Sequence, residues 1–302
     1  MSTTIESPLA RLTDEQIEEL GREFDGIHDE VFSDLGDRDR KYIVSMIEMH
    51  RRIVVASRIL LFASRFKPAW LVGTAGLSMA KILENMEIGH NVMHGQWDWM
   101  NDPDIHSSQW DWDSASTPEA WKHSHNYVHH TYTNIRGKDR DLGYEIMRID
   151  PSQKWYPFYL AQPLYNLVLA AFFEWGVATH DLDFEAIKKG EKPKEKIVEE
   201  LKGMARKGGT QIAKDYIAYP ALAGAAGAAV GALRGGRKGA IDGFKQAYKT
   251  NLTANFTANI VRNVWAYAII FCGHFPDQTY TFDQDEVADE SRGGFYVRQL
   301  LG

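Results

Sequence analysis

The sequence has one cysteine, no nucleotide-binding glycine motif and no basic stripe, and each absence removes a class of protein. The single cysteine, Cys272, excludes an intramolecular disulfide and a zinc or iron–sulfur site built from several cysteines. No G-x-G-x-x-G motif lies between a strand and a helix, so no dinucleotide-binding domain is expected. A net charge of −7 without a basic stripe excludes a nucleic-acid partner. The first residues, MSTTIESPLARLTDEQIEEL, do not have the pattern of a signal peptide.

Histidine, in contrast, is concentrated in one stretch: seven of the eleven histidines lie between positions 90 and 130. His90 and His94 are four residues apart, as are His125 and His129, and His130 follows directly. On an α-helix this spacing places two imidazoles on one face. Imidazole is a good ligand for zinc, copper, iron and nickel. A lone histidine is more often a structural residue, but this set predicts a metal site with all five histidines as ligands and catalytic residues.

The sequence around these histidines resembles a known family. GHNVMHG and WKHSHNYVHHTYTN are similar to the first two histidine boxes of the integral-membrane fatty acid desaturases. The flanking GHNVMHGQWDWMNDP and TNIRGKDRDLGY resemble the bacterial acyl-lipid or acyl-CoA branch. The resemblance runs from about Lys41 to the end of the chain, so residues 41–302 are expected to form a desaturase-like domain after a polar segment, residues 1–40.

The resemblance implies a reaction and its cofactors. It implies two irons held by histidines from three boxes, and an O2-dependent desaturation of a fatty acyl chain bound as acyl-CoA or acyl-lipid. No redox module is visible in the sequence. The electrons are therefore expected from an external donor, either a ferredoxin-like protein or a cytochrome-type protein with its reductase. The expected location is the bacterial plasma membrane, in contact with lipid, with the metal site on the cytoplasmic side.

The third box of that family, usually Gln-x-x-His-His, is not found. After His180 the remaining histidine is His274, which follows an apolar run and is predicted to be a sixth metal ligand. Two irons require about eight to ten ligands, so six imidazoles are enough to hold one iron well or two irons poorly. Three carboxylates near the boxes are possible substitutes: Glu84, Glu87 and Asp98.

The chain ends after the apolar pair Leu300-Leu301. Together with the missing box, this ending predicts an incomplete version of a longer desaturase. As given, the chain is expected to hold substoichiometric iron and to turn over little.

The hydropathy pattern predicts an all-α fold with membrane helical hairpins and a cytosolic helical cap that carries the histidine-rich metal site. Mean hydropathy is negative, but the termini and the charged stretch 181–214 account for most of that. A span needs about 20 apolar residues. Three arginines in the first run are costly in lipid unless they lie near an end. The candidate spans are Ile43–Phe62, Ala69–Ile88, Tyr216–Leu233 and Leu252–Gly273, with Trp155–Val177 along the surface.

Smaller features complete the predictions. Thr13 and Gln16 form a capping box that opens a short helix, and 234–238 is a basic turn. The repeated Gln-Trp-Asp-Trp at 96–99 and 109–112 favours aromatic packing. The alternative is that a nearby aspartate accepts a hydrogen bond from a ligating histidine, the candidates being Asp98, Asp102, Asp111 and Asp113. His123 is predicted to lie behind the ligands, and His106 has no assigned role. The ordinary histidines are His28, His50 and His180.

Three other functions fit the same residues. A related membrane di-iron hydroxylase would form an alcohol where a desaturase forms an alkene. A truncated desaturase-like chain would have no activity. A soluble helical zinc or iron protein would be extracted without detergent.

Overall fold

The computed structural model of the chain describes residues 7–151, 153–276 and 278–302. Over these ranges the secondary structure is helical, apart from one isolated parallel bridge between Ile135 and Phe282. The predicted all-α fold is therefore confirmed. The chain divides into two compact units. Unit 1 comprises Met1–Asp39, Lys122–Pro163 and Phe271–Gly302, and unit 2 comprises Arg40–Trp121 and Leu164–Ile270.

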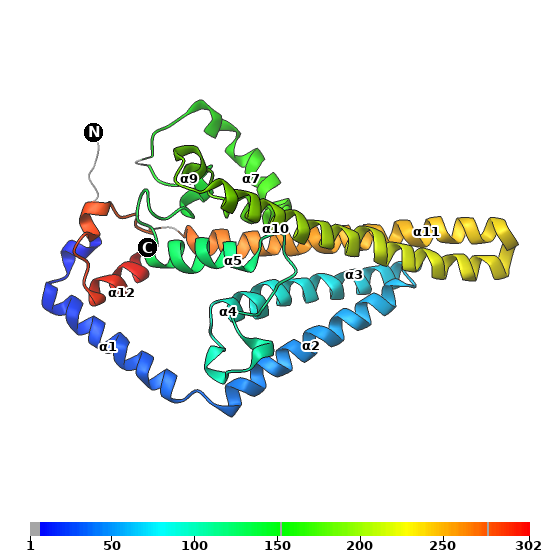
Figure 1. Cartoon of the computed structure of the whole chain (residues 1–302), viewed down its shortest axis with the longest axis horizontal. Coiled ribbons are helices and arrows are strands. Elements are labelled where there is room, and N and C mark those ends of the chain that lie inside the picture. The colour runs from blue at the N-terminus through cyan, green and yellow to red at the C-terminus, as the bar shows by residue number, and fades with distance from the viewer. Residues whose placement is uncertain (1–6, 152, 277) are drawn as a thin grey trace. The chain divides into compact units, whose positions relative to one another are not determined.

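Unit 1 contains a close crossing of two helices, α1 (Asp14–Ser33) and α12 (Arg292–Leu301) (Figure 1). The predicted capping box begins α1: the backbone N–H of Thr13 donates to Gln16 Oε1 at 2.9 Å, and the N–H of Gln16 donates to the Thr13 hydroxyl at 3.3 Å. A Cβ at Gly21 would lie 2.9 Å from the Cα of Gly293. The two helices therefore meet backbone to backbone, which requires small residues on both.

The other elements of unit 1 are short. They are η1 (Pro8–Arg11), the π-helix η5 (Lys122–His129), α6 (His130–Tyr132), η6 (Leu142–Glu145), η7 (Pro157–Ala161) and η9 (Gln284–Val287). Backbone hydrogen bonds from Arg136 N to Phe282 O (2.9 Å) and from Phe282 N to Asn134 O (2.8 Å) join two of its chain segments. These bonds hold the chain that follows η5.

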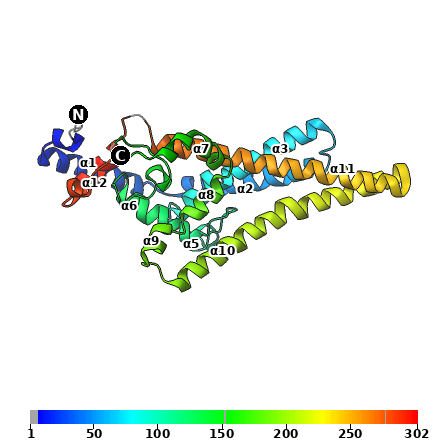
Figure 2. The same ribbon diagram turned by 90° about the horizontal axis from the view of Figure 1, so that it is seen from above.

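The first hairpin of unit 2 pairs α2 (Asp37–Leu61) with α3 (Lys67–Ile82), which lie side by side in both views (Figures 1 and 2). Pro68 stands in the first turn of α3, where its missing N–H costs nothing. After α3 the chain continues as the π-helix η2 (Leu83–Gly89) and then α4 (His90–Met93). The loop after α4 contains two short 3-10 turns, η3 (Asp98–Met100) and η4 (Pro103–Ile105), and leads to α5 (Pro118–Trp121).

The second hairpin of unit 2 is built from α10 (Lys194–Ile212), the π-helix η8 (Ala213–Ala218) and α11 (Tyr219–His274). The chain reverses inside α11 at Gly235 and Gly236, which lies within the predicted basic turn at 234–238 (Figures 1 and 2). Gly236 has φ +56°, a conformation that favours glycine. A Cβ at Gly227 would lie 2.5 Å from the Gly243 carbonyl oxygen, so the two arms touch through their backbones.

We expect Gly231→Leu to destabilise this hairpin strongly. A Cβ at Gly231 would overlap the carbonyl oxygen of Gly239, and the clash involves backbone that cannot rotate away. Overpacking of this kind costs about 3 kcal/mol or more. The midpoint of thermal unfolding, followed by circular dichroism in detergent, measures the effect. Gly235→Ala is the control, because no heavy atom lies within 4 Å of its Cβ. Equal midpoints for both variants would contradict the close contact.

The predicted surface run Trp155–Val177 is divided into three elements. They are η7 and two helices, α7 (Gln162–Ala171) and α8 (Phe173–His180), separated at Phe172 with φ −118° and ψ 32°. Three of its four leucines, Leu160, Leu164 and Leu167, are exposed by 68–77%. The remaining helix of unit 2, α9 (Phe184–Lys189), lies in the charged stretch before α10. The run therefore presents an apolar surface to its surroundings.

The second arm of α11 is polar where it is buried and apolar where it is exposed. The buried face carries four asparagines and an arginine that are at most 3% exposed: Asn251, Asn255, Asn259, Arg262 and Asn263. The opposite face exposes Phe256, Val261, Val264, Trp265 and Ile269 by 41–52%. Water favours the reverse arrangement, because apolar surface leaves water and polar groups remain in it. Among the described residues, one helical run, Lys194–His274, is long and apolar enough to cross a membrane by length and composition.

Candidate metal centre

The first histidine pair lies in unit 2, on α4 directly after η2. The Nε2 atoms of His90 and His94 are 3.0 Å apart, and the ring centroids are 4.5 Å apart. Both rings pack edge-on against Trp121, at 5.4 and 5.5 Å. The two imidazoles therefore converge, as the four-residue spacing predicts.

The second group lies in unit 1 and depends on a π-helix, where an α-helix was expected. His125 and His129 belong to η5, and His130 follows it. In an α-helix, residues five apart lie about 140° apart around the axis. In a π-helix the hydrogen bonds run from i to i+5, so such residues share a face. Accordingly, the Nε2 atoms of His125 and His130 are 3.2 Å apart.

His274 joins this second group. It ends α11, and its ring stacks on the ring of His129 with a centroid distance of 4.7 Å and an interplanar angle of 18°. The predicted ligands thus form two sets, His90 and His94 in unit 2, and His125, His129, His130 and His274 in unit 1.

Two aspartates that the sequence analysis did not single out complete the group in unit 1. Asp139 is buried, and its two carboxylate oxygens lie 3.1 and 3.2 Å from Nδ1 of His129. Asp141 Oδ2 lies 3.6 Å from His129 Nδ1, and 3.9 Å from both His125 Nδ1 and His274 Nε2. His125, His129 and Asp141 offer ligand atoms within 4.8 Å of one another. The signal was the run GKDRD, which follows the second motif directly.

Hydrogen bonds hold Asp139 in place. It accepts from the backbone N–H groups of Asn134 (2.8 Å) and Asp141 (2.9 Å) as well as from His129. Three donors hold the orientation of this buried carboxylate. In the neutral form of His129, the hydrogen bond to Asp139 would place the ring proton on Nδ1 and leave the lone pair on Nε2.

Burial and nearby carboxylates act in opposite directions on the pKa values of His125 and His129. Burial lowers the pKa of His125 to about 3, although the hydrogen bond and charge of Asp141 act in the opposite direction. Burial also acts to lower the pKa of His129, but its bond to Asp139 and the charge of Asp141 outweigh burial and raise it. At neutral pH His125 is therefore uncharged, which is the protonation state that binds a metal. The donor set, imidazoles with two nearby carboxylates, fits a first-row transition metal.

The carboxylates considered as substitute ligands have other partners. Glu84 Oε1 accepts from the backbone N–H of Asp113 at 2.9 Å. Glu87 accepts from the hydroxyl of Tyr42. Asp98 accepts from the backbone N–H (2.8 Å) and the hydroxyl (2.6 Å) of Ser107. Each therefore has a structural role in unit 2.

The two Gln-Trp-Asp-Trp segments pack as the favoured interpretation predicts. The rings of Trp112 and Trp121 pack with a centroid distance of 5.3 Å and an interplanar angle of 56°, and they form a core cluster with Met93. Trp97 belongs to a second cluster of unit 2. The other histidines are peripheral. His106 Nδ1 lies 3.7 Å from Asp98, and exposed His123 stacks on Tyr127 at 5.7 Å.

Comparison with known proteins agrees with the motifs. A family model described as fatty acid desaturase matches residues 68–280, which include all six predicted histidine ligands. The chain is 43% identical over its 302 residues to the NADPH-dependent stearoyl-CoA 9-desaturase of Mycobacterium tuberculosis and covers 67% of that protein. It is 32% identical over 121 residues to the sn-1 linoleoyl-lipid 6-desaturase of Synechocystis sp., covering 38% of this chain and 33% of that protein. No solved structure matches the chain.

Proposed function

Because the chain belongs to the fatty acid desaturase family, we propose that it introduces a double bond into a fatty acyl chain with O2 and a histidine-bound iron centre. The reaction removes two hydrogen atoms from neighbouring methylene carbons. Together with two electrons and two protons from a donor, they reduce O2 to two waters. The observation that carries the proposal is the convergence of imidazoles in both histidine sets, 3.0 Å between His90 and His94 and 3.2 Å between His125 and His130.

The residues of the site divide into ligands and residues that orient them. His90, His94, His125, His129, His130 and His274 are the proposed ligands. Asp139 fixes the tautomer of His129 through the bond to Nδ1. Asp141 balances positive charge near three of the imidazoles. Iron bound there would supply the activation of O2 needed to take hydrogen from an unactivated methylene. The protein positions the acyl chain and excludes water.

The number of ligands limits how much metal the chain holds. Six imidazoles are fewer than the about eight to ten ligands that two irons need. We therefore expect fewer than two irons per chain and a low rate. For this reason the function is tested by the identity of the product and not by its rate.

The product test uses the purified chain with stearoyl-CoA, O2, NADPH, a ferredoxin and its reductase. Identity to a stearoyl-CoA desaturase over the whole chain favours an acyl-CoA substrate over an acyl-lipid, since the acyl-lipid relative aligns over 38%. We expect a monounsaturated acyl chain, identified by gas chromatography and mass spectrometry. A hydroxylated product would assign the hydroxylase reaction.

The same assay tests the electron donor. Without carrier and reductase no product should form, because the sequence has no nucleotide-binding motif. Product from NADPH alone would contradict an external donor.

We further propose that the helical hairpins of unit 2 lie in a lipid bilayer, in the bacterial plasma membrane, with the metal site on the cytoplasmic side. The reversed polarity of α11 supports this, because lipid favours buried asparagines and exposed Phe256 and Trp265. Arg58, which is costly in the first apolar run, is 10% exposed and paired with Asp215 at 2.9 Å. α3 has 16 residues, which is fewer than the about 20 residues that a membrane span needs. The helix continues without a break as η2, which lengthens it.

This placement predicts how the protein fractionates. We expect the chain in the membrane pellet after lysis and carbonate extraction, and in solution only with detergent. The physical reason is the exposed apolar face of α11 and α7. A chain that is soluble and folded by circular dichroism without detergent would contradict the placement and favour a soluble helical metal protein.

A further inference from the structure

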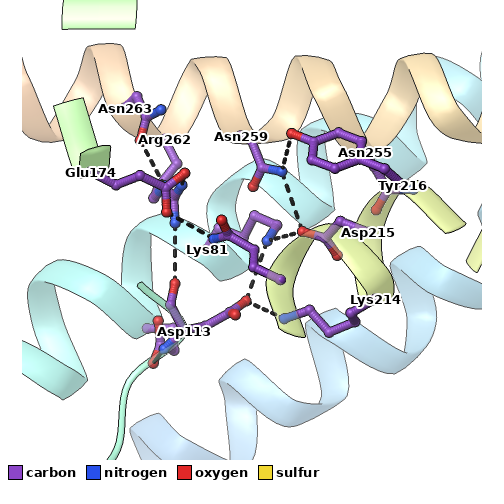
Figure 3. Close-up of polar contacts among 12 residues, drawn as sticks. Lys81, Asp113, Glu174, Lys214, Asp215, Tyr216, Asn255, Asn259, Arg262 and Asn263 are labelled. Carbon is purple, nitrogen blue, oxygen red and sulfur yellow. Dashed lines mark hydrogen bonds and ion pairs between the residues drawn. The ribbon is translucent and has the colours of Figure 1, made fainter. Parts of the chain in front are cut away.

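A buried network of charged side chains lies in the middle of unit 2 (Figure 3). Asp215 is fully buried and accepts from Lys81 Nζ at 2.8 Å and from Arg58 Nη2 at 2.9 Å. Lys81 is 6% exposed and also lies 3.4 Å from Asp113. A second part joins Arg262 to Glu174, whose Oε2 accepts from Gln211 at 2.8 Å. A buried ion pair stabilises a protein little more than apolar side chains in the same place would. A network of this size is therefore better explained by a role in fixing the positions of the segments that it joins.

Within the network, Asp113 contacts the helical run α3–η2 through both its backbone and its side chain. Its backbone N–H donates to Glu84 Oε1 at 2.9 Å, and its carboxylate lies 3.4 Å from Lys81 Nζ. Its carbonyl oxygen accepts from Arg262 Nη1 at 3.2 Å, and its carboxylate also accepts from Lys214. Lys81, Glu84 and Asp113 are called the clamp below. The clamp ties the loop before α5 to the helical run α3–η2.

The clamp lies at the N-terminal end of the π-helix η2. At its C-terminal end lies Gly89, where a side chain would have little room. A Cβ at Gly89 would lie 2.8 Å from the backbone oxygen of Glu84 and 3.3 Å from Cβ of Trp112. The π-helical turn is thus closed around Glu84 and packed against the residue that precedes Asp113. His90 follows Gly89 directly.

The form of η2 decides where the first histidine pair points. A π-helical turn contains one residue more than an α-helical turn, so everything after it rotates by about 100° around the helix axis. If residues 83–89 returned to α-helix, His90 and His94 would turn away together. They would keep their mutual spacing but would point in another direction.

We propose that the clamp holds Leu83–Gly89 in the π-helical form and thereby sets the direction of His90 and His94, so that Glu84 is a positioning residue of the metal centre. The inference rests on the proposed function in one respect, that His90 and His94 bind metal. Glu84 acts through its hydrogen bond to the loop and not as a ligand. Partly buried and hydrogen-bonded to the backbone of Asp113, it fixes the helix to the loop.

Three variants of the full chain in detergent separate this role from general stability. Glu84→Leu removes the hydrogen-bond acceptor for the Asp113 N–H and replaces it with an apolar side chain of similar size. Glu84→Gln keeps an oxygen at that position. Glu174→Gln weakens the same buried network at Arg262 and Gln211, away from η2. Each protein is titrated with Co(II) as the sole probe, and its visible absorption spectrum and thermal midpoint are recorded.

We expect Glu84→Leu to bind Co(II) about 10–100-fold more weakly, as for other residues that orient ligands, with altered absorption bands. Glu84→Gln should match the wild type in affinity and spectrum. Glu174→Gln should lower the thermal midpoint without changing the spectrum. Gly89→Ala is the second route: it strains η2 without touching a carboxylate and should reproduce the spectral change of Glu84→Leu.

Two results overturn the inference. One is a Glu84→Leu protein with wild-type Co(II) affinity and spectrum. The other is a Glu84→Leu protein whose thermal midpoint falls as in Glu174→Gln while its spectrum stays that of the wild type. His90→Ala separates failure of the inference from failure of the proposed function. If His90→Ala leaves Co(II) binding unchanged, the ligand assignment fails. If His90→Ala loses binding while Glu84→Leu keeps it, only the clamp fails.

Discussion

Alanine in place of His129 is expected to weaken Co(II) or Fe(II) binding by at least about 100-fold and to abolish product formation, because a proposed ligand and its oriented lone pair are both lost. His129 is bound to Asp139 at 3.1 Å and stacks on His274 at 4.7 Å, so no neighbouring side chain replaces it without moving both. Metal content by plasma mass spectrometry and Co(II) titration measure the effect.

The same loss is expected for the other four box histidines: His90, His94, His125 and His130. His28→Ala is the matched control, because His28 is exposed and its ring contacts Asp29 and Phe32 on α1. Two or more of the five box variants with wild-type metal affinity and product formation would show that the cluster is not the metal centre.

The largest effect on stability is expected at Asp215. Asp215→Leu leaves Arg58 and Lys81 buried without their shared carboxylate, and breaking a buried pair in this way costs about 3–5 kcal/mol. For a chain of 302 residues, that corresponds to a fall of about 5–8 °C in the thermal midpoint. Circular dichroism in detergent measures it.

Asp242→Asn is the control for that experiment, because Asp242 is an exposed carboxylate on the same hairpin, and its midpoint should not change. A midpoint within about 2 °C of the wild type for Asp215→Leu, an interval of about 1 kcal/mol, would mean that water reaches the two cations and that the network is not dry.

Much of the local structure followed from the sequence because it depends on neighbours along the chain. The capping box of Thr13 and Gln16 and the reversal at Gly235 and Gly236 are set by backbone conformation and by hydrogen bonds within a few residues. The four-residue spacing of His90 and His94 likewise predicted converging rings, and the rings converge. Such features need no information about the rest of the fold.

The sequence did not reveal the π-helical turns or the partners of the histidines. One inserted residue in a helical turn leaves no periodic signal, so η5 was expected as an α-helix, yet it is the π-form that brings His130 to His125. Asp98, Asp102, Asp111 and Asp113 were considered as partners because they lie near the motifs. The aspartates beside the imidazoles are Asp139 and Asp141, which a turn of the chain returns to η5.

The amino-acid sequence by itself determined the helical class, the hairpin turn and the histidine pairs, because each arises from interactions within one or two helical turns. Tertiary structure alone decided the charges that α11 buries and the carboxylates that face the imidazoles. Arg58 was costly in a lone apolar helix, and it is stable here because Asp215, 157 residues later, accepts its hydrogen bond. A buried charge is tolerated only with its partner, and the partner is chosen by packing between distant segments, which no local pattern of residues records.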